Sequence, residues 1–86
     1  MDKRILILRQ DIDNIDEKIL SLLKERMKIS RKVGELKSKL DVPIEDSNRE
    51  KTIIERLTHH AKGTLSEEQL IRIFTAVFKS SKQVQQ

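Results

Sequence analysis

Apolar residues recur between residues 5 and 40 with alternating steps of three and four. The positions are Ile5, Leu8, Ile12, Ile15, Ile19, Leu22, Ile29, Val33, Leu36 and Leu40, and Arg26 alone interrupts the series. This apolar seam has heptad spacing, which is typical of a helix that packs against other helices along its whole length. The first proline is Pro43, and a residue that precedes proline disfavours helical backbone. The pattern therefore predicts one long helix from Asp2 or Lys3 to about Leu40.

A second helix is predicted after this proline. It should begin between Asp46 and Asn48, because Ser47 and Glu50 have capping-box spacing, and end at Gly63 as a C-cap. Its apolar stripe is Ile53, Ile54, Leu57 and Ala61. The spacing of this stripe indicates a short amphipathic helix.

A third helix is predicted to begin at Thr64 or Ser66, with Thr64 and Glu67 as a possible capping box. It should fray after about Gln85. Its apolar stripe is Leu70, Ile73, Phe74, Val77 and Phe78. The predicted fold class is therefore all-α, with residues 1–86 forming a single domain.

The length of the first helix predicts an oligomer. A helix of nearly forty residues is roughly 55 Å long, whereas a compact chain of this size has a radius of gyration of about 12 Å. Two shorter helices on one flank cannot bury so long a seam on all sides. We therefore expect an intertwined homodimer with three helices per protomer, and a two-stranded coiled coil with a helical hairpin is the alternative.

Composition narrows the chemistry. Apolar residues make up 36% of the chain and charged residues 37%, with no Trp, Tyr or Cys, so the core must be mainly Ile, Leu and Val. Without cysteine there can be no disulfide, thiolate nucleophile or Cys-ligated zinc. The apolar run at the N-terminus is too short for a signal peptide or a membrane span, so we expect a cytoplasmic protein. His59 and His60 point about 100° apart on a helix and are expected to face solvent rather than a metal.

Polar residues also lie on the faces that the patterns predict to be buried. They are Arg26, Lys37, Glu50, Ser81 and Gln85. A guanidinium cannot be deprotonated, so Arg26 needs either an internal carboxylate such as Glu50 or a bound acid. Each of the others also has an ordinary interpretation: Lys37 can extend to solvent, Glu50 can cap a helix, and Ser81 and Gln85 can be frayed surface. Together the five predict a site for a small anion, without a nucleophile or a metal cluster.

Several stretches of the chain resemble the all-helical chorismate mutase family, and together they cover nearly all of it. They are residues 8–12, 15–16, 22–26, 33–37 and 43–50, followed by Ile73-Phe74, Ser81 and Gln85. The specific part is Pro-x-x-Asp-x-x-Arg-Glu at 43–50, at this distance after Arg26 and Lys37 and before Ser-x-x-x-Gln. The visible departure from the family is a shorter connection around Gly63, away from these motifs.

The resemblance implies an isomerase that converts chorismate to prephenate in the shikimate pathway, toward phenylalanine and tyrosine. It also implies a homodimer with two sites shared between protomers and no cofactor. The roles it implies are carboxylate binding for Arg9, Arg26, Arg49 and Ser81, contact with the ether oxygen for Lys37 and Gln85, and contact with the hydroxyl group for Asp46 and Glu50.

Helix geometry bears on Arg9 separately. It precedes Arg26 by about 25 Å along one straight helix and lies on a different face, so the two cannot share a small ligand within one chain. If Arg9 belongs to the site, the other protomer must supply it.

Two other functions stay open at this point. An isochorismate pyruvate lyase of the same fold would share the arginines, the lysine and the glutamine, but Asp46 and the Arg49-Glu50 pair favour the mutase. A non-catalytic dimerisation or nucleic-acid-binding module is suggested by the net charge of +4. Interleaving of the basic residues with Asp and Glu disfavours nucleic acid as a partner. The short apolar run at the N-terminus likewise gives no reason to expect a membrane as a partner.

Overall fold

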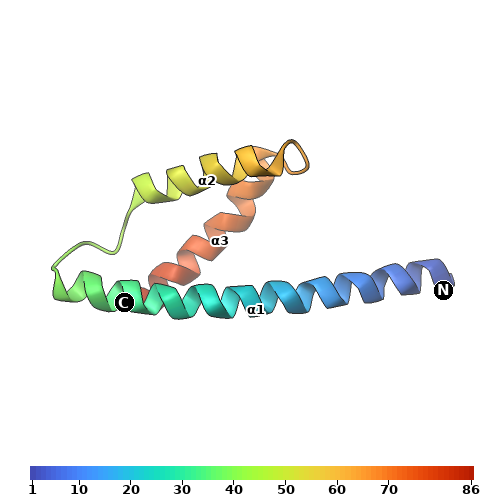
Figure 1. The fold of residues 1–86 in the computed structure, drawn as a ribbon, viewed down its shortest axis with the longest axis horizontal. Coiled ribbons are helices and arrows are strands. Elements are labelled where there is room, and N and C mark those ends of the chain that lie inside the picture. The colour runs from blue at the N-terminus through green and yellow to red at the C-terminus, as the bar shows by residue number, and fades with distance from the viewer.

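The computed structural model describes residues 1–86 and contains three helices and no strand. They are α1 (Lys3–Lys39), α2 (Ser47–Ala61) and α3 (Glu67–Gln85). The all-α prediction and the unbroken first helix are therefore confirmed. Figure 1 shows α1 as a long rod with its N-terminal half projecting beyond the other two helices.

The helix caps differ in part from the predictions. Asp46, not Ser47, caps α2, because its Oδ1 accepts a hydrogen bond from the Arg49 amide at 3.0 Å. The capping box of α3 is Ser66 with Gln69 rather than Thr64 with Glu67. In both cases a neighbouring residue has the extended or non-helical backbone that a cap requires, which spacing alone does not reveal.

The ends of α1 and α2 both use left-handed backbone. Lys62, not Gly63, is the C-cap of α2, with φ of 49°, and Gly63 follows at φ of 81°. After α1, Asp41 has φ of 56°, and the Val42 amide donates to the Lys37 carbonyl at 2.8 Å. This six-residue hydrogen bond belongs to a Schellman motif, which satisfies helix carbonyls before the chain reaches proline.

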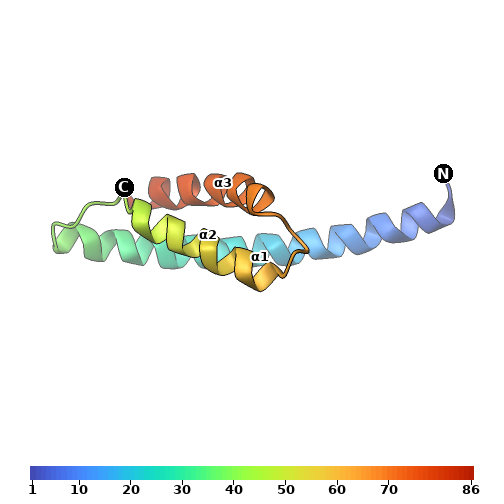
Figure 2. The same ribbon diagram turned by 90° about the horizontal axis from the view of Figure 1, so that it is seen from above.

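Helix α3 joins the other two helices. It packs against both α1 and α2, whereas α1 and α2 do not pack on each other. In Figure 1, α3 runs diagonally between them, and Figure 2 shows α3 beside α1 from above. The buried apolar core is small and consists of Ile53, Leu70 and Phe78. The packing of α3 on the other two helices therefore buries only a small apolar core within the chain.

The face of α1 that packs within the chain is displaced from the apolar seam. Buried or half-buried positions on α1 are Leu23, Arg26, Met27, Ser30, Gly34 and Lys37. Apart from Arg26, each of these follows a seam position by one residue, which is about 100° around the helix. The first six residues of the seam, from Ile5 to Leu22, each remain between 46% and 64% exposed. The prediction that the seam lies at a helix contact is therefore not met within a single chain.

The shape of the chain is extended. Its radius of gyration is 16.4 Å and its longest dimension is 56 Å. The accessible surface is 7347 Å², although a folded monomer of 10.1 kDa has about 5,300 Å². Most of the exposed large apolar side chains belong to α1. None of the three helices combines the length and apolar character that a bilayer crossing requires.

Candidate active site

A cavity of about 300 Å³ lies where the three helices come together at the C-terminal half of α1. This volume is at the lower end of the range for small-molecule sites. Its polar lining is Arg26, Ser30, Lys37, Asp46, Arg49, Glu50, Ser81, Lys82 and Gln85, and its apolar lining is Ile29, Val33, Ile44, Ile53 and Phe78. Of the eight residues predicted for the site, all but Arg9 line this cavity.

Arg26 has no carboxylate partner. Its guanidinium donates a hydrogen bond to Ser81 Oγ and lies over the ring of Phe78, 5.9 Å from the centroid. The chain has three ion pairs and none includes Arg26, so the predicted alternative of an internal pair with Glu50 is wrong. Burial, and to a smaller extent the charge of Arg49, lower the pKa of Arg26. A half-buried guanidinium held this way leaves donors free for an anion.

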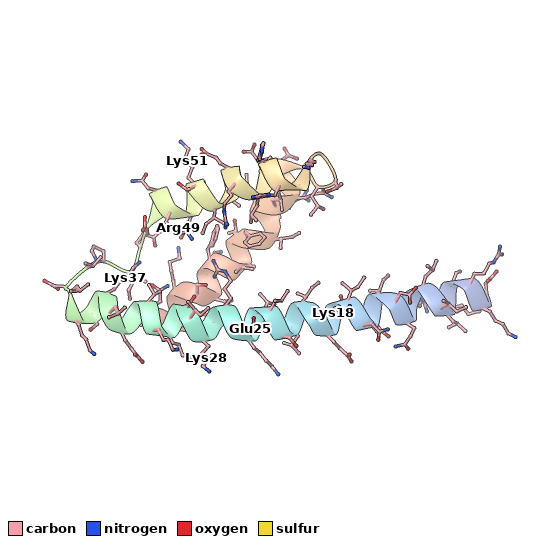
Figure 3. All side chains as sticks on the ribbon, viewed as in Figure 1. Lys18, Glu25, Lys28, Lys37, Arg49 and Lys51 are labelled. Atoms are coloured by element: carbon pink, nitrogen blue, oxygen red, sulfur yellow. The ribbon has the colours of Figure 1, made fainter.

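Lys37 lies on the same side of α1 as Arg26 and is held by the connection to α2. Its Nζ donates to the backbone carbonyl of Ile44 at 3.1 Å. In Figure 3, Lys37 is on the side of α1 that faces α2, and Arg49 is on the side of α2 that faces α1, whereas Lys28 and Lys51 point outward. Lys37 therefore does not extend freely into solvent, although that was its ordinary interpretation.

The start of α2 contributes three charged residues to the cavity. Asp46 caps the helix, which directs its carboxylate toward the backbone of the first turn. Arg49 and Glu50 follow within that turn and both line the cavity. Glu50 forms an ion pair with Lys82 at 3.4 Å and is not part of a capping box. The helix cap thus orients the segment that carries these charges.

Lys82 is a lining residue that the sequence did not predict. Its Nζ lies 3.2 Å from Glu45 and 3.4 Å from Glu50, so it links α3 to both the connection and α2. The hydrogen bond to Glu45 raises the pKa of Lys82, and burial partly opposes this effect. The sequence did contain a sign that Lys82 faces the cavity. It follows Phe78 by four residues and precedes Gln85 by three, so the three side chains lie near one another on the same side of α3.

The end of α3 places two neutral polar residues against α1. Ser81 is buried and accepts a hydrogen bond from Ser30 Oγ at 3.2 Å. The Oε1 atom of Gln85 is buried without a hydrogen-bond partner in the chain. Both residues belong to α3 and line the cavity, so the interpretation of them as frayed surface is wrong. An amide oxygen left unpaired in a cavity wall is a free hydrogen-bond acceptor.

Arg9 lies outside this cavity. It is exposed on the projecting N-terminal half of α1. About 25 Å of continuous helix separates it from Arg26, as the sequence predicted. A single chain therefore brings together seven of the eight predicted residues and leaves Arg9 apart.

The cavity carries an excess of positive charge. Four cations, Arg26, Lys37, Arg49 and Lys82, face two carboxylates, Asp46 and Glu50. Lys82 compensates Glu50, which leaves the other three cations without an ion-pair partner in the chain. No group of three or more His, Cys, Asp or Glu side chains has the arrangement of a metal site. The site suits a small ligand with two negative charges and a compact apolar body.

Comparison with known proteins identifies relatives over nearly the whole chain. Residues 8–86 match the family of chorismate mutase type II. The chain is 36% identical to the chorismate mutase of Methanocaldococcus jannaschii, over 99% of this chain and 87% of that protein. It is 39% identical to the bifunctional chorismate mutase/prephenate dehydratase of Aquifex aeolicus, over 85% of this chain but only 21% of the relative. The chain thus spans about a fifth of the length of that bifunctional relative.

Solved structures agree with these relatives. Form II of the chorismate mutase of Thermus thermophilus superposes with a TM-score of 0.90 at 32% identity, over 95% of this chain and 93% of that one. A conserved hypothetical protein from Pyrococcus furiosus superposes over the full length of both chains, with a TM-score of 0.81 at 34% identity. The sequence match, the shared fold and the cationic cavity agree, and the chain belongs to the chorismate mutase type II family.

Proposed function

We propose that residues 1–86 form a chorismate mutase domain, which rearranges chorismate to prephenate on the way to phenylalanine and tyrosine. The observation that carries this proposal is the half-buried Arg26, which faces a small cavity without any carboxylate of its own chain to neutralise it. Burial of an unpaired cation costs free energy, and an anion that binds beside the cation offsets this cost. Chorismate carries two carboxylates on a compact ring and supplies that anion.

The rearrangement is concerted and needs no acid, base, nucleophile or cofactor. One C–O bond breaks as one C–C bond forms within the same molecule. The protein therefore has to hold the enolpyruvyl arm over the ring and to stabilise negative charge on the ether oxygen as it leaves. A cavity lined by cations and by the side-chain amide of Gln85 is suited to both tasks.

In this proposal each lining residue has a role that fits its position. Arg26 and Arg49 bind the carboxylates through their guanidinium groups, with Ser81 supporting Arg26. Lys37 from α1 and Gln85 from α3 approach the ether oxygen from two sides, and Asp46 and Glu50 contact the ring hydroxyl.

A second copy of the chain completes the proposed site. Each chain exposes about 2,000 Å² more surface than a compact monomer of its mass. Burial of this excess on both chains would total about 4,000 Å², which lies within the range for obligate homodimers. The exposed apolar seam provides a continuous surface for this contact, from Ile5 to Leu22. In an antiparallel pair of long helices, the projecting N-terminal half of one α1 lies along the other protomer. Arg9 then reaches the partner's cavity and binds a substrate carboxylate there.

The direct test is to supply the purified chain with chorismate and, separately, with isochorismate. We expect chorismate to be depleted with stoichiometric formation of prephenate, and no pyruvate to be released from either compound. Pyruvate release from isochorismate would instead identify the lyase of the same fold. A chain that leaves both compounds unchanged would contradict the proposal.

A Gln85→Glu variant is expected to be active only at acid pH. The amide can donate a hydrogen bond to the ether oxygen at any pH, whereas a carboxyl group donates only when it is protonated. An exposed glutamate has a pKa of about 4.3, and burial raises this value, so kcat/KM of the variant should fall as the pH rises through that range. Chorismate turnover measured across the acid and neutral pH range checks this expectation, with the wild-type chain as the reference.

Gln83→Glu is the matched control for this variant, because Gln83 is exposed on the same turn of α3. It adds the same charge outside the cavity and should keep the wild-type pH profile. A Gln85→Glu variant with an equally flat profile would show that Gln85 does not donate to the reacting oxygen.

A further inference from the structure

We propose that Gly34 is a positioning residue for Gln85: the missing side chain lets the last turn of α3 lie directly on α1. A Cβ atom at position 34 would lie 2.6 Å from both the Cα and the carbonyl oxygen of Gln85, and 2.8 Å from its Cβ. A Cβ atom essentially never lies within 3.0 Å of such a neighbouring heavy atom. Two of the three atoms are backbone, so the end of α3 itself would have to move.

The local backbone gives no other reason for a glycine at this position. Gly34 lies inside α1 and is buried, and its φ is not positive, unlike that of Gly63. Glycine weakens the interior of a helix, and alanine is the best helix former. The close approach of α3 is therefore the feature that requires glycine at position 34.

Contacts between α1 and α3 occur on two successive helical turns. Ser30 contacts Ser81 through a hydrogen bond of 3.2 Å, and four residues later on both helices Gly34 contacts Gln85. Gln85 is the last residue of α3, so no following turn holds it in place. The Gly34 contact thus sets how close this residue lies to α1, while the Ser30 contact holds the rest of the helix.

This contact determines the separation of the two groups that we assign to the ether oxygen. Lys37 follows Gly34 by one helical turn, so it lies on nearly the same side of α1. Gln85 lines the same cavity from α3. A Cβ at position 34 would push Gln85 away from Lys37 but would leave Lys37 on its helix.

The inference rests on the proposed function, and wild-type turnover of chorismate tests that function first. In the Gly34→Ala variant we then expect kcat to fall by about 10- to 100-fold, because small displacements of a catalytic group have effects of this size. KM should change little, since Arg26 and Arg49 are not displaced. Glu35→Ala is the control, because Glu35 is the exposed neighbour on the same helix, and it should retain wild-type kinetics.

A double-variant experiment separates positioning from a general structural effect. If Gly34 acts through Gln85, Gly34→Ala should lower kcat by no more than about twofold in a Gln85→Ala background. The inference would be overturned if the double variant lost kcat by the product of the two single losses, because the two residues would then act independently. It would also be overturned if Gly34→Ala kept the wild-type kcat. Loss of the helical circular-dichroism signal in Gly34→Ala would also overturn it, because the displacement is assigned to the last turn of α3 alone.

A readout that does not depend on activity completes the test. The side-chain amide of Gln85 gives a distinct ¹⁵N–¹H NMR signal, which Gln85→Ala identifies. We expect this signal to shift in Gly34→Ala and to stay unchanged in Glu35→Ala. A shifted signal in a chain that does not turn over chorismate would support the contact while the proposed function failed. An unshifted signal would overturn the inference even in an active enzyme.

Discussion

Replacing Lys37 with alanine is expected to lower kcat/KM for chorismate by about a thousandfold, the upper range for removing one donor to a developing oxyanion. In the proposed site the ammonium group contacts the ether oxygen, and Lys37 is half-buried, so water screens its charge less than that of an exposed lysine. Steady-state kinetics of the purified variant measure the loss. The helices should persist, because Lys37 contributes only one side-chain hydrogen bond, to Ile44.

Lys39→Ala is the matched control for this variant. Lys39 is a lysine in the same last turn of α1, but it is exposed and lies outside the cavity that Lys37 lines. Its removal changes the net charge by the same amount and should leave kcat/KM near the wild-type value. Equal kinetics for Lys37→Ala and Lys39→Ala would remove Lys37 from the mechanism.

Mixing two inactive variants is expected to restore about a quarter of wild-type activity. Arg9→Ala and Lys37→Ala should each be nearly inactive alone, because each damages both sites of a symmetric dimer. In a mixed dimer, one site combines the intact Lys37 of the first chain with the intact Arg9 of the second. Random reassortment makes about half of the dimers mixed, each with one working site of two. Co-refolding the two chains at equal concentration, followed by a chorismate assay, measures the recovery.

Lys37→Ala mixed with Arg26→Ala is the control for this experiment. These residues line the same cavity of the same chain, so a mixed dimer has no intact site and should stay inactive. Recovery in this control, or none in the Arg9→Ala mixture, would contradict a site shared between protomers. A chain that elutes as a monomer in size-exclusion chromatography with light scattering would contradict the dimer itself.

The helices could be predicted because their causes are local. The heptad spacing of α1, the proline that follows it and the polar residues before α2 and α3 all act within a few positions of the chain. The caps were placed one or two residues away because Asp46 and Ser66 compete with neighbours that have similar side chains. Only the backbone conformation decides which residue accepts the amide hydrogen bond.

The candidate site was predictable for side chains that interrupt an apolar pattern. Arg26 interrupts the seam, and Ser81 and Gln85 extend the stripe of α3, so periodicity marks all three. Lys82 was missed because lysines are usual on exposed faces, and its ion pairs join residues distant in sequence. The role of Gly34 was not visible either, since a glycine in a helix does not indicate which backbone approaches it.

The sequence by itself determined three amphipathic helices, a long first helix with more apolar surface than one chain buries, and most of the polar residues that line the cavity. Only the tertiary structure decided that α1 packs internally on a face one residue away from its seam, that Arg26 has no carboxylate partner, and that Lys82 pairs with Glu50. The reason is physical: periodicity along one helix sets which residues share a face, whereas the crossing of α1 and α3 sets which face meets which.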